Sequence, residues 1–151
     1  MSADLLLRAT RRAPMTGHDG RSGALLERAE LDDGRRVVIK TTSPALDLAM
    51  LVTDDSDGRE RRLWQDGTLD RLPPGAGHCI LDAHLDHDGR IVTVMDDLGD
   101  HVLGWDDRLT GQDCGRIIDA IARMHDALSG APPAAAMPLE RWLTMLGPDV
   151  M

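Results

Sequence analysis

The chain has 151 residues and a mass of 16.5 kDa, about the size of one domain. Acidic residues outnumber basic ones by 26 to 17, so the net charge of −9 argues against a nucleic-acid-binding protein and against docking on an anionic membrane. No apolar run in the sequence is long enough to span a bilayer. Cys79 and Cys114 do not suggest a disulfide framework, so we expect a reducing, cytoplasmic setting and small buried thiols.

The first forty residues are punctuated by glycine. Residues 2–12 predict a short helix with Ser2 as its N-cap, and a glycine-rich turn follows over 16–23. Residues 24–31 and 35–40 predict two strands joined by the tight turn Asp32-Asp33-Gly34. The expected order up to residue 40 is therefore a strand, a glycine loop, a strand, a turn and a strand.

The middle of the chain alternates between helix and strand signals. Apolar residues 45–52 predict one or two helical turns, and a helix is expected from about 58 to 66 after the acidic run 54–57. Two further strands are expected at 79–85 and 91–95, joined by the hairpin turn 86–89. His84 and His87 lie near this turn with several aspartates, but a solvated turn explains them better than a metal site.

The remainder of the chain is helical in pattern. Residues 110–128, capped by Thr110, carry an apolar stripe that predicts a packed helix and includes Ile117, Ile118, Ile121, Met124, His125 and Leu128. A last amphipathic segment spans 139–146. The sequence therefore predicts an α+β fold, with about five antiparallel strands, one helix inserted after the third strand, and then helices.

Lys40 is the one lysine in a chain whose other 16 basic residues are arginines. It ends the predicted strand Val37-Val38-Ile39-Lys40, 17 residues after Gly23. One interpretation is an exposed lysine at a strand end. The other is a site that needs a compact charge on a flexible stem, which a planar guanidinium does not replace.

Glu60 lies 20 residues after Lys40 on the predicted helix, and it is one of four glutamates against 22 aspartates. A solvated glutamate paired with a flanking arginine is one interpretation. The other is a carboxylate whose longer side chain reaches across to a strand.

The order and spacing of five segments resemble a known family. They are Thr16-Gly-His-Asp-Gly-Arg-Ser-Gly-Ala24, Gly34-Arg-Arg-Val-Val-Ile-Lys40, Gly58-Arg-Glu60, Val94-Met-Asp-Asp-Leu-Gly99 and Ile121-Ala-Arg-Met-His125. Together they look like the N-terminal part of an aminoglycoside phosphotransferase or choline kinase type protein, which has the protein-kinase-like fold. The resemblance implies a nucleotide-binding N-lobe over residues 1–98, followed by a hinge and the start of a helical C-lobe over 99–151.

The resemblance also implies roles for single residues. Gly20, Ser22 and Gly23 would lie over the phosphates of ATP, Lys40 would contact those phosphates, and Glu60 would orient Lys40. Met95 would lie behind the adenine, and Asp97 and Leu98 would offer main-chain hydrogen bonds to it; an ordinary strand-to-loop exit is the alternative. A complete enzyme would use Mg²⁺ and transfer phosphate to the hydroxyl of a small molecule.

One family motif is missing. The catalytic loop His-Gly-Asp, with its asparagine and a later metal-binding aspartate, does not occur in these 151 residues. We therefore expect a truncated enzyme that is inactive alone. Two alternatives stay open: a non-catalytic nucleotide-binding or interaction module, and a degenerate remnant. In the former, residues 110–146 would cover the exposed apolar surface or form a homodimer patch.

Overall fold

The computed structural model describes residues 3–16, 23–103, 106–130 and 133–144. Five strands carry the fold: β1 (Ala9–Pro14), β2 (Leu25–Leu31), β3 (Arg36–Thr42), β4 (Ile80–Leu85) and β5 (Ile91–Asp96). The helices are α1 (Ala3–Leu7), α2 (Leu48–Val52), α3 (Arg59–Gln65), α4 (Gly111–Leu128) and α5 (Leu139–Thr144). Two 3-10 turns, η1 (Leu69–Arg71) and η2 (Gly99–His101), complete the described elements.

The strands form one antiparallel sheet in the order β1-β2-β3-β5-β4, which confirms the predicted α+β class. The turns after β2 and β4 place Gly34 and Gly89 at φ of +81° and +74°, a conformation that glycine adopts without strain. The segment with α2, α3 and η1 separates β3 from β4, and β5 pairs with both of these strands.

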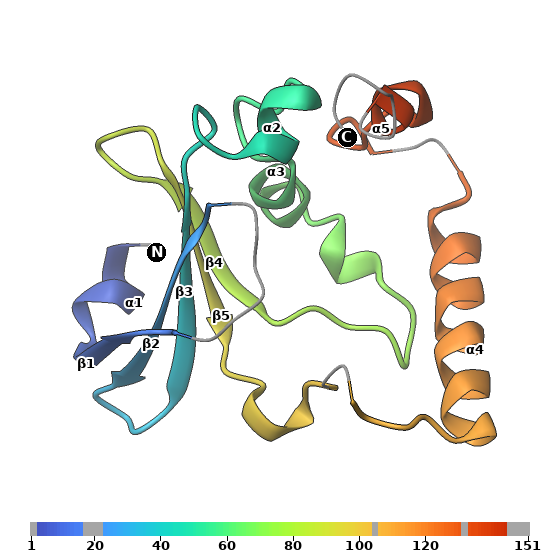
Figure 1. Ribbon diagram of the computed structural model, residues 1–151, viewed down its shortest axis with the longest axis horizontal. Helices are drawn as coiled ribbons and strands as arrows, with labels where there is room; N and C mark the ends of the chain where they lie inside the picture. The colour runs from blue at the N-terminus through green and yellow to red at the C-terminus, as the bar shows by residue number, and fades with distance from the viewer. Residues whose placement is uncertain (1–2, 17–22, 104–105, 131–132, 145–151) are drawn as a thin grey trace.

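One face of the sheet holds the main hydrophobic core. Alternate residues of the three adjacent strands β2, β3 and β5 point into it, and residues of α1, β1 and β4 pack against them, as Figure 1 shows for α1 beside β1 and β2. The buried members are Ala29, Leu31, Val37, Ile39, Val92 and Val94, with Leu5, Leu6, Ala9 and Leu81 against them.

The opposite face carries α3, and it is the face of Lys40. Register pairs Lys40 with Leu26 on β2 and with Thr93 on β5, and Thr93 pairs in turn with Ala83 on β4. Gln65, the last residue of α3, donates from Nε2 to the Ala83 carbonyl at 3.2 Å, which ties the helix to β4. The predicted helix of 58–66 therefore exists and lies against the sheet.

One sequence prediction near the start of the chain needs correction. The helix expected over 2–12 ends at Leu7, and Ala9–Pro14 instead pairs with β2 as an edge strand. The amphipathic segment expected over 139–146 forms helix α5 over Leu139–Thr144, and its last two residues lie outside the described residues. There Arg141 Nη1 donates to the Thr53 carbonyl at 3.0 Å and to Asp54 Oδ2 at 3.2 Å, so α5 contacts the segment between α2 and α3.

Helix α4 forms as predicted but does not pack as predicted. Thr110 caps it, and the Thr110 and Asp113 side chains exchange hydrogen bonds with each other's backbone in a capping box. The three isoleucines of its stripe are nevertheless exposed, with Ile118 at 64%, while Met124 and Leu128 are half-buried; His125 and Cys114 are exposed as well, against expectation. Figure 1 shows why: α4 stands apart from the sheet. Across the described ranges, no helix combines the length and the apolar character needed to cross a bilayer.

Candidate functional site

Lys40 and Glu60 meet in the structure. The Lys40 Nζ lies 2.9 Å from Glu60 Oε2, joining β3 to α3. Both side chains are half-buried, at 32% and 40% exposure, so the pair is screened by water but open to a ligand. The prediction that these two residues approach each other is confirmed.

The arginines around Glu60 are engaged elsewhere. Arg59 and Arg62 lie 3.5 and 3.7 Å from the carboxylate of Asp55, which is 8% exposed. Arg61 donates to the Asp57 carbonyl and to Gln65. The alternative in which Glu60 pairs with a flanking arginine is therefore not what the structure contains.

The start of α3 sets the position of Glu60. Asp55 Oδ2 accepts a hydrogen bond from the Arg59 N–H at 2.9 Å, which satisfies one of the free donors of the first helical turn. Gly58 precedes the helix at φ +76° with Ile91 directly beside it. Buried Asp55 and the missing side chain of Gly58 together anchor the helix so that Glu60 faces β3.

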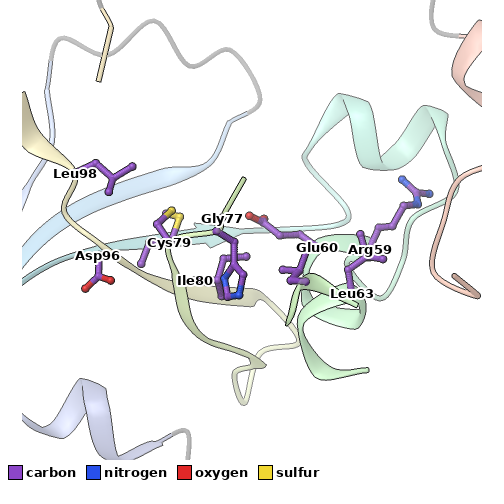
Figure 2. Close-up of a pocket in the computed structure, with 11 residues that line it drawn as sticks. Arg59, Glu60, Leu63, Gly77, Cys79, Ile80, Asp96 and Leu98 are labelled. Atoms are coloured by element: carbon purple, nitrogen blue, oxygen red, sulfur yellow. The ribbon is translucent and has the colours of Figure 1, made fainter. Parts of the chain in front are cut away.

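A cavity of about 660 Å³ runs from α3 to the end of β5. Its lining is mainly apolar, with Leu63, Ile80 and Met95, and its polar groups include Glu60 and Asp96. Figure 2 shows Leu98 at one end of the lining and Arg59 and Leu63 at the other. The volume and character are those of a site for a small organic ligand.

A second hollow, of about 350 Å³, lies on the other side of the ion pair and includes Lys40 itself. Arg59 and Glu60 line both spaces, so the two meet at α3. The buried carboxylates of Asp47 and Asp55 border this smaller hollow. Asp47 caps α2 by accepting a hydrogen bond from the Met50 N–H at 3.0 Å.

The strand exit at 95–99 is partly as expected. Met95 lies beside Val38 and Ile80 in register and lines the larger cavity. Leu98 is 46% exposed, and its carbonyl accepts from the His101 N–H at 2.8 Å. Within the described residues nothing accepts a hydrogen bond from the Leu98 N–H, so this donor can serve a ligand.

Asp97 is built into the protein more firmly than expected. Its N–H donates to the Arg36 carbonyl at 3.2 Å, so it has no main-chain donor left for a ligand. Its carboxylate is 4% exposed, lies 3.4 Å from Arg28 Nε and accepts from the Gly99 N–H. Of the main-chain groups predicted to meet a base, the Leu98 N–H is thus the one available donor in this described segment.

The glycine-rich turn falls mostly outside the described residues, and the predicted phosphate-binding residues Gly20 and Ser22 lie in that undescribed part. Gly23 is described, with φ +80°. A Cβ placed on it would lie 3.9 Å from the Leu46 carbonyl, so the end of the turn approaches the segment between β3 and α2. The backbone conformation there is one that favours glycine.

The histidines and aspartates near the hairpin turn at 86–89 make contacts within the protein. His84 Nδ1 lies 2.8 Å from Asp82 Oδ2. Ligand atoms of Asp86, His87 and Asp88 lie within 4.8 Å of one another at the hairpin turn. Asp86 Oδ1 accepts from two backbone N–H groups of that turn, and the Arg90 N–H is the main reason that the pKa of Asp86 lies below its usual range.

Several lining residues of the larger cavity were not foreseen. They come from α3, η1 and the approach to β4, and are Leu63, Leu69, His78 and Cys79. Cys79 is half-buried, where the sequence suggested a buried thiol. No sequence signal marks these positions, because they become neighbours only when α3 packs on the sheet.

Comparison with known proteins finds no matching family model, no matching curated protein and no matching solved structure. The functional argument therefore depends on the geometry of the chain itself.

Proposed function

We propose that the chain is the nucleotide-binding lobe of an ATP-dependent phosphotransferase that acts on a small-molecule hydroxyl, of the aminoglycoside phosphotransferase or choline kinase type. The observation that carries the proposal is the 2.9 Å pair between Lys40 on the third strand and Glu60 on the helix before the fourth. Kinase-like lobes need a lysine and glutamate in these two positions to be paired before they can orient phosphates.

In this proposal Glu60 holds the Lys40 ammonium in place, and the ammonium contacts the α- and β-phosphates. Lys40 is half-buried, so its remaining donors can turn to a phosphate without leaving Glu60. Gly20, Ser22 and Gly23 would cover the phosphates with backbone N–H groups. When bound, ATP supplies the γ-phosphoryl group. The proposal assigns none of these residues to Mg²⁺, which would belong to a complete enzyme.

The surface beside Lys40 suits a flat heterocycle. Val38 and Met95 are paired in register on the sheet face that carries Lys40, and Leu26 is the direct partner of Lys40 on β2. All three are half-buried, so they offer apolar contact that remains accessible. The free Leu98 N–H lies at the end of this surface and would donate to a ring nitrogen.

Binding and transfer are separable in this chain. Transfer needs a positioned base and metal-held charge, and no His-Gly-Asp sequence occurs among the 151 residues. We therefore expect these residues alone to bind ATP weakly and to transfer nothing. The same observation favours the second candidate, a non-catalytic nucleotide-binding or interaction module. Both cysteines are free, in keeping with the cytoplasmic location that we propose.

Calorimetry with ATP and with adenosine tests the proposal. Lys40→Ala should weaken ATP binding about tenfold, the effect of losing one charge-assisted hydrogen bond, and should leave adenosine binding unchanged. Glu60→Gln should weaken ATP binding less. Arg61→Ala is the matched control, because Arg61 lies on the same helix but is bonded to Asp57 and Gln65.

Equal ATP binding by the native chain and Lys40→Ala would remove Lys40 from the site and end the proposal. Failure of the folded native chain to bind ATP would do the same. Phosphorylation of a small hydroxyl compound by the purified 151 residues would instead show that the catalytic base lies within them.

A further inference from the structure

A third hollow, of about 450 Å³, lies at the opposite end of β3 from Lys40. Arg36 and Lys40 are four residues apart on that strand, so they share a sheet face and lie about 13 Å apart along it. Neither Lys40 nor Glu60 lines this space, and it is therefore distinct from the site described above. Its charged lining is mostly arginine, in a chain whose net charge is −9.

Strand register brings the arginines together. Arg11 on β1 pairs with Glu30 on β2, and Glu30 pairs with Arg36 on β3, so these three form one row across the sheet. Arg28 belongs to the next row on the same face, because it pairs with Val38. Three neighbouring strands thus each direct one guanidinium to this hollow.

Two of these guanidiniums have no partner among the residues that the structure describes. Arg28 lies 3.4 Å from the buried Asp97 carboxylate. In the described part of the chain, by contrast, neither the Arg11 nor the Arg36 guanidinium makes a hydrogen bond or ion pair. Arg36 Nη2 lies beside Gly99, 3.9 Å from where a Cβ on that residue would be.

Glu30 does not neutralise its neighbours. Directly opposite charges on adjacent strands commonly pair and stabilise a sheet. Here the described residues include no ion pair within 4.0 Å between the Glu30 carboxylate and Arg11 or Arg36. Arg12 also lines the hollow but is paired with Glu27, so three arginines face the carboxylates of Glu30 and Asp97, which leaves an excess of one positive charge.

We propose that this hollow, lined by Arg11, Arg28 and Arg36, binds the compact anionic group of a small molecule, a phosphate or a carboxylate. Guanidinium is the side chain best matched to both groups, because its planar donors bind two oxygens at once. The net charge of −9 over the whole chain repels polyanionic macromolecules but leaves a local cationic hollow open to a small ligand. The proposal stands independently of the nucleotide site.

The test is calorimetry at low ionic strength with two probes, inorganic pyrophosphate and citrate. Arg11→Gln and Arg36→Gln should each weaken binding about fivefold, and the double variant more, because each change removes a charge-assisted bond and keeps much of the side chain. Glu30→Gln should strengthen binding about twofold by removing a repelling carboxylate. Arg123→Gln, an exposed change on α4, is the matched control and should bind like the native chain.

The two probes separate the ligand classes. If the arginine variants lose affinity for both probes, the hollow recognises a compact anion by its charge. If they lose affinity for one probe alone, the hollow is assigned to phosphate or to carboxylate accordingly. The proposal is overturned if the folded native chain binds neither probe, or if Arg123→Gln weakens binding as much as Arg36→Gln. Lys40→Ala should leave pyrophosphate affinity unchanged, and a loss there would place the anion at Lys40 instead.

Discussion

Gly58 and Ile91 are in such close contact that no side chain fits between them. A Cβ built on Gly58 would lie 2.4 Å from Ile91 Cδ1 and 3.0 Å from Cγ1. Gly58 also has φ +76°, and Ile91 is 4% exposed. Because Gly58 immediately precedes α3, this contact fixes how closely the helix that carries Glu60 approaches β5.

Gly58→Ala should therefore destabilise the protein by two separate effects. A left-handed backbone conformation costs a non-glycine residue about 1 kcal/mol or more, and the clash with Ile91 adds to it. We expect a total of about 2 to 3 kcal/mol in the free energy of unfolding, measured by urea denaturation.

Gly34→Ala is the matched control for Gly58→Ala. Gly34 has φ +81°, and nothing lies within 4 Å of a Cβ built on it, so its substitution adds backbone strain alone. Adding Ile91→Val, which removes Cδ1, should recover part of the loss in Gly58→Ala and none in Gly34→Ala. Equal destabilisation by Gly58→Ala and Gly34→Ala would show that the clash with Ile91 does not contribute to the loss of stability.

The Lys40–Glu60 pair should contribute little to stability. Both side chains are about one-third exposed or more, so water and salt screen the pair, and comparable ion pairs contribute about 0.2 to 1 kcal/mol. A double-mutant cycle with Lys40→Met and Glu60→Gln should give a coupling energy in that range, decreasing with added salt. A coupling of several kcal/mol would mean that the pair holds the fold together and does not mainly serve a ligand.

Two isoleucines should differ sharply in their contribution to the free energy of unfolding. Ile39 is 1% exposed in the core of the sheet, and Ile39→Ala should lower the free energy of unfolding by about 2 to 5 kcal/mol. Ile118 is 64% exposed on α4, and Ile118→Ala should change it by less than about 0.5 kcal/mol. A large loss from Ile118→Ala would show that α4 packs against something in solution.

The capping box of α4 predicts a dependence on pH. The Thr110 hydroxyl donates to Asp113 Oδ2, and this is the main reason that the pKa of Asp113 lies below its ordinary value. Because the folded pKa is depressed, the stabilisation is present above the unfolded pKa of about 3.9 and is lost as pH falls through the folded value.

Thr110→Ala should shift the carboxyl titration midpoint of Asp113 upward in an NMR titration, and it should reduce the helicity of α4 at neutral pH. Asp86 is the internal reference, since its pKa is lowered chiefly by the Arg90 N–H. An unchanged Asp113 midpoint in Thr110→Ala would contradict the assigned cause.

Sequence patterns predicted an element correctly where the interactions that form it span only a few residues. The Asp-Gly turn at 32–34 and the Thr110 cap depend on neighbours in sequence, and the structure contains both. The approach of Lys40 and Glu60, which are 20 residues apart, was instead expected from the family resemblance, and the structure contains it as well. The strand expected before the glycine loop was not located at Ala9–Pro14, because nearly all residues of β1 are exposed and it lacks the apolar alternation of a half-buried strand.

Long-range packing explains the other differences. The stripe of α4 has the right period for a packed helix, but a period cannot say which surface covers it, and Ile117 and Ile121 are exposed. The engagement of the Asp97 N–H by Arg36, and the gathering of Arg11, Arg28 and Arg36, both follow from register between strands. The register between strands depends on the whole sheet, so it cannot be predicted from the sequence of any one strand.

The strand order leaves β1 and β4 as the outer strands, where a foreign strand could pair and begin aggregation. Strand β1 carries Arg11 and Arg12 and ends at Pro14, and charge and proline both discourage such pairing. On β4, Gln65 occupies the Ala83 carbonyl from the adjoining helix. Arg11, which lines the hollow, thus also helps to keep separate copies of the chain from pairing through their edge strands.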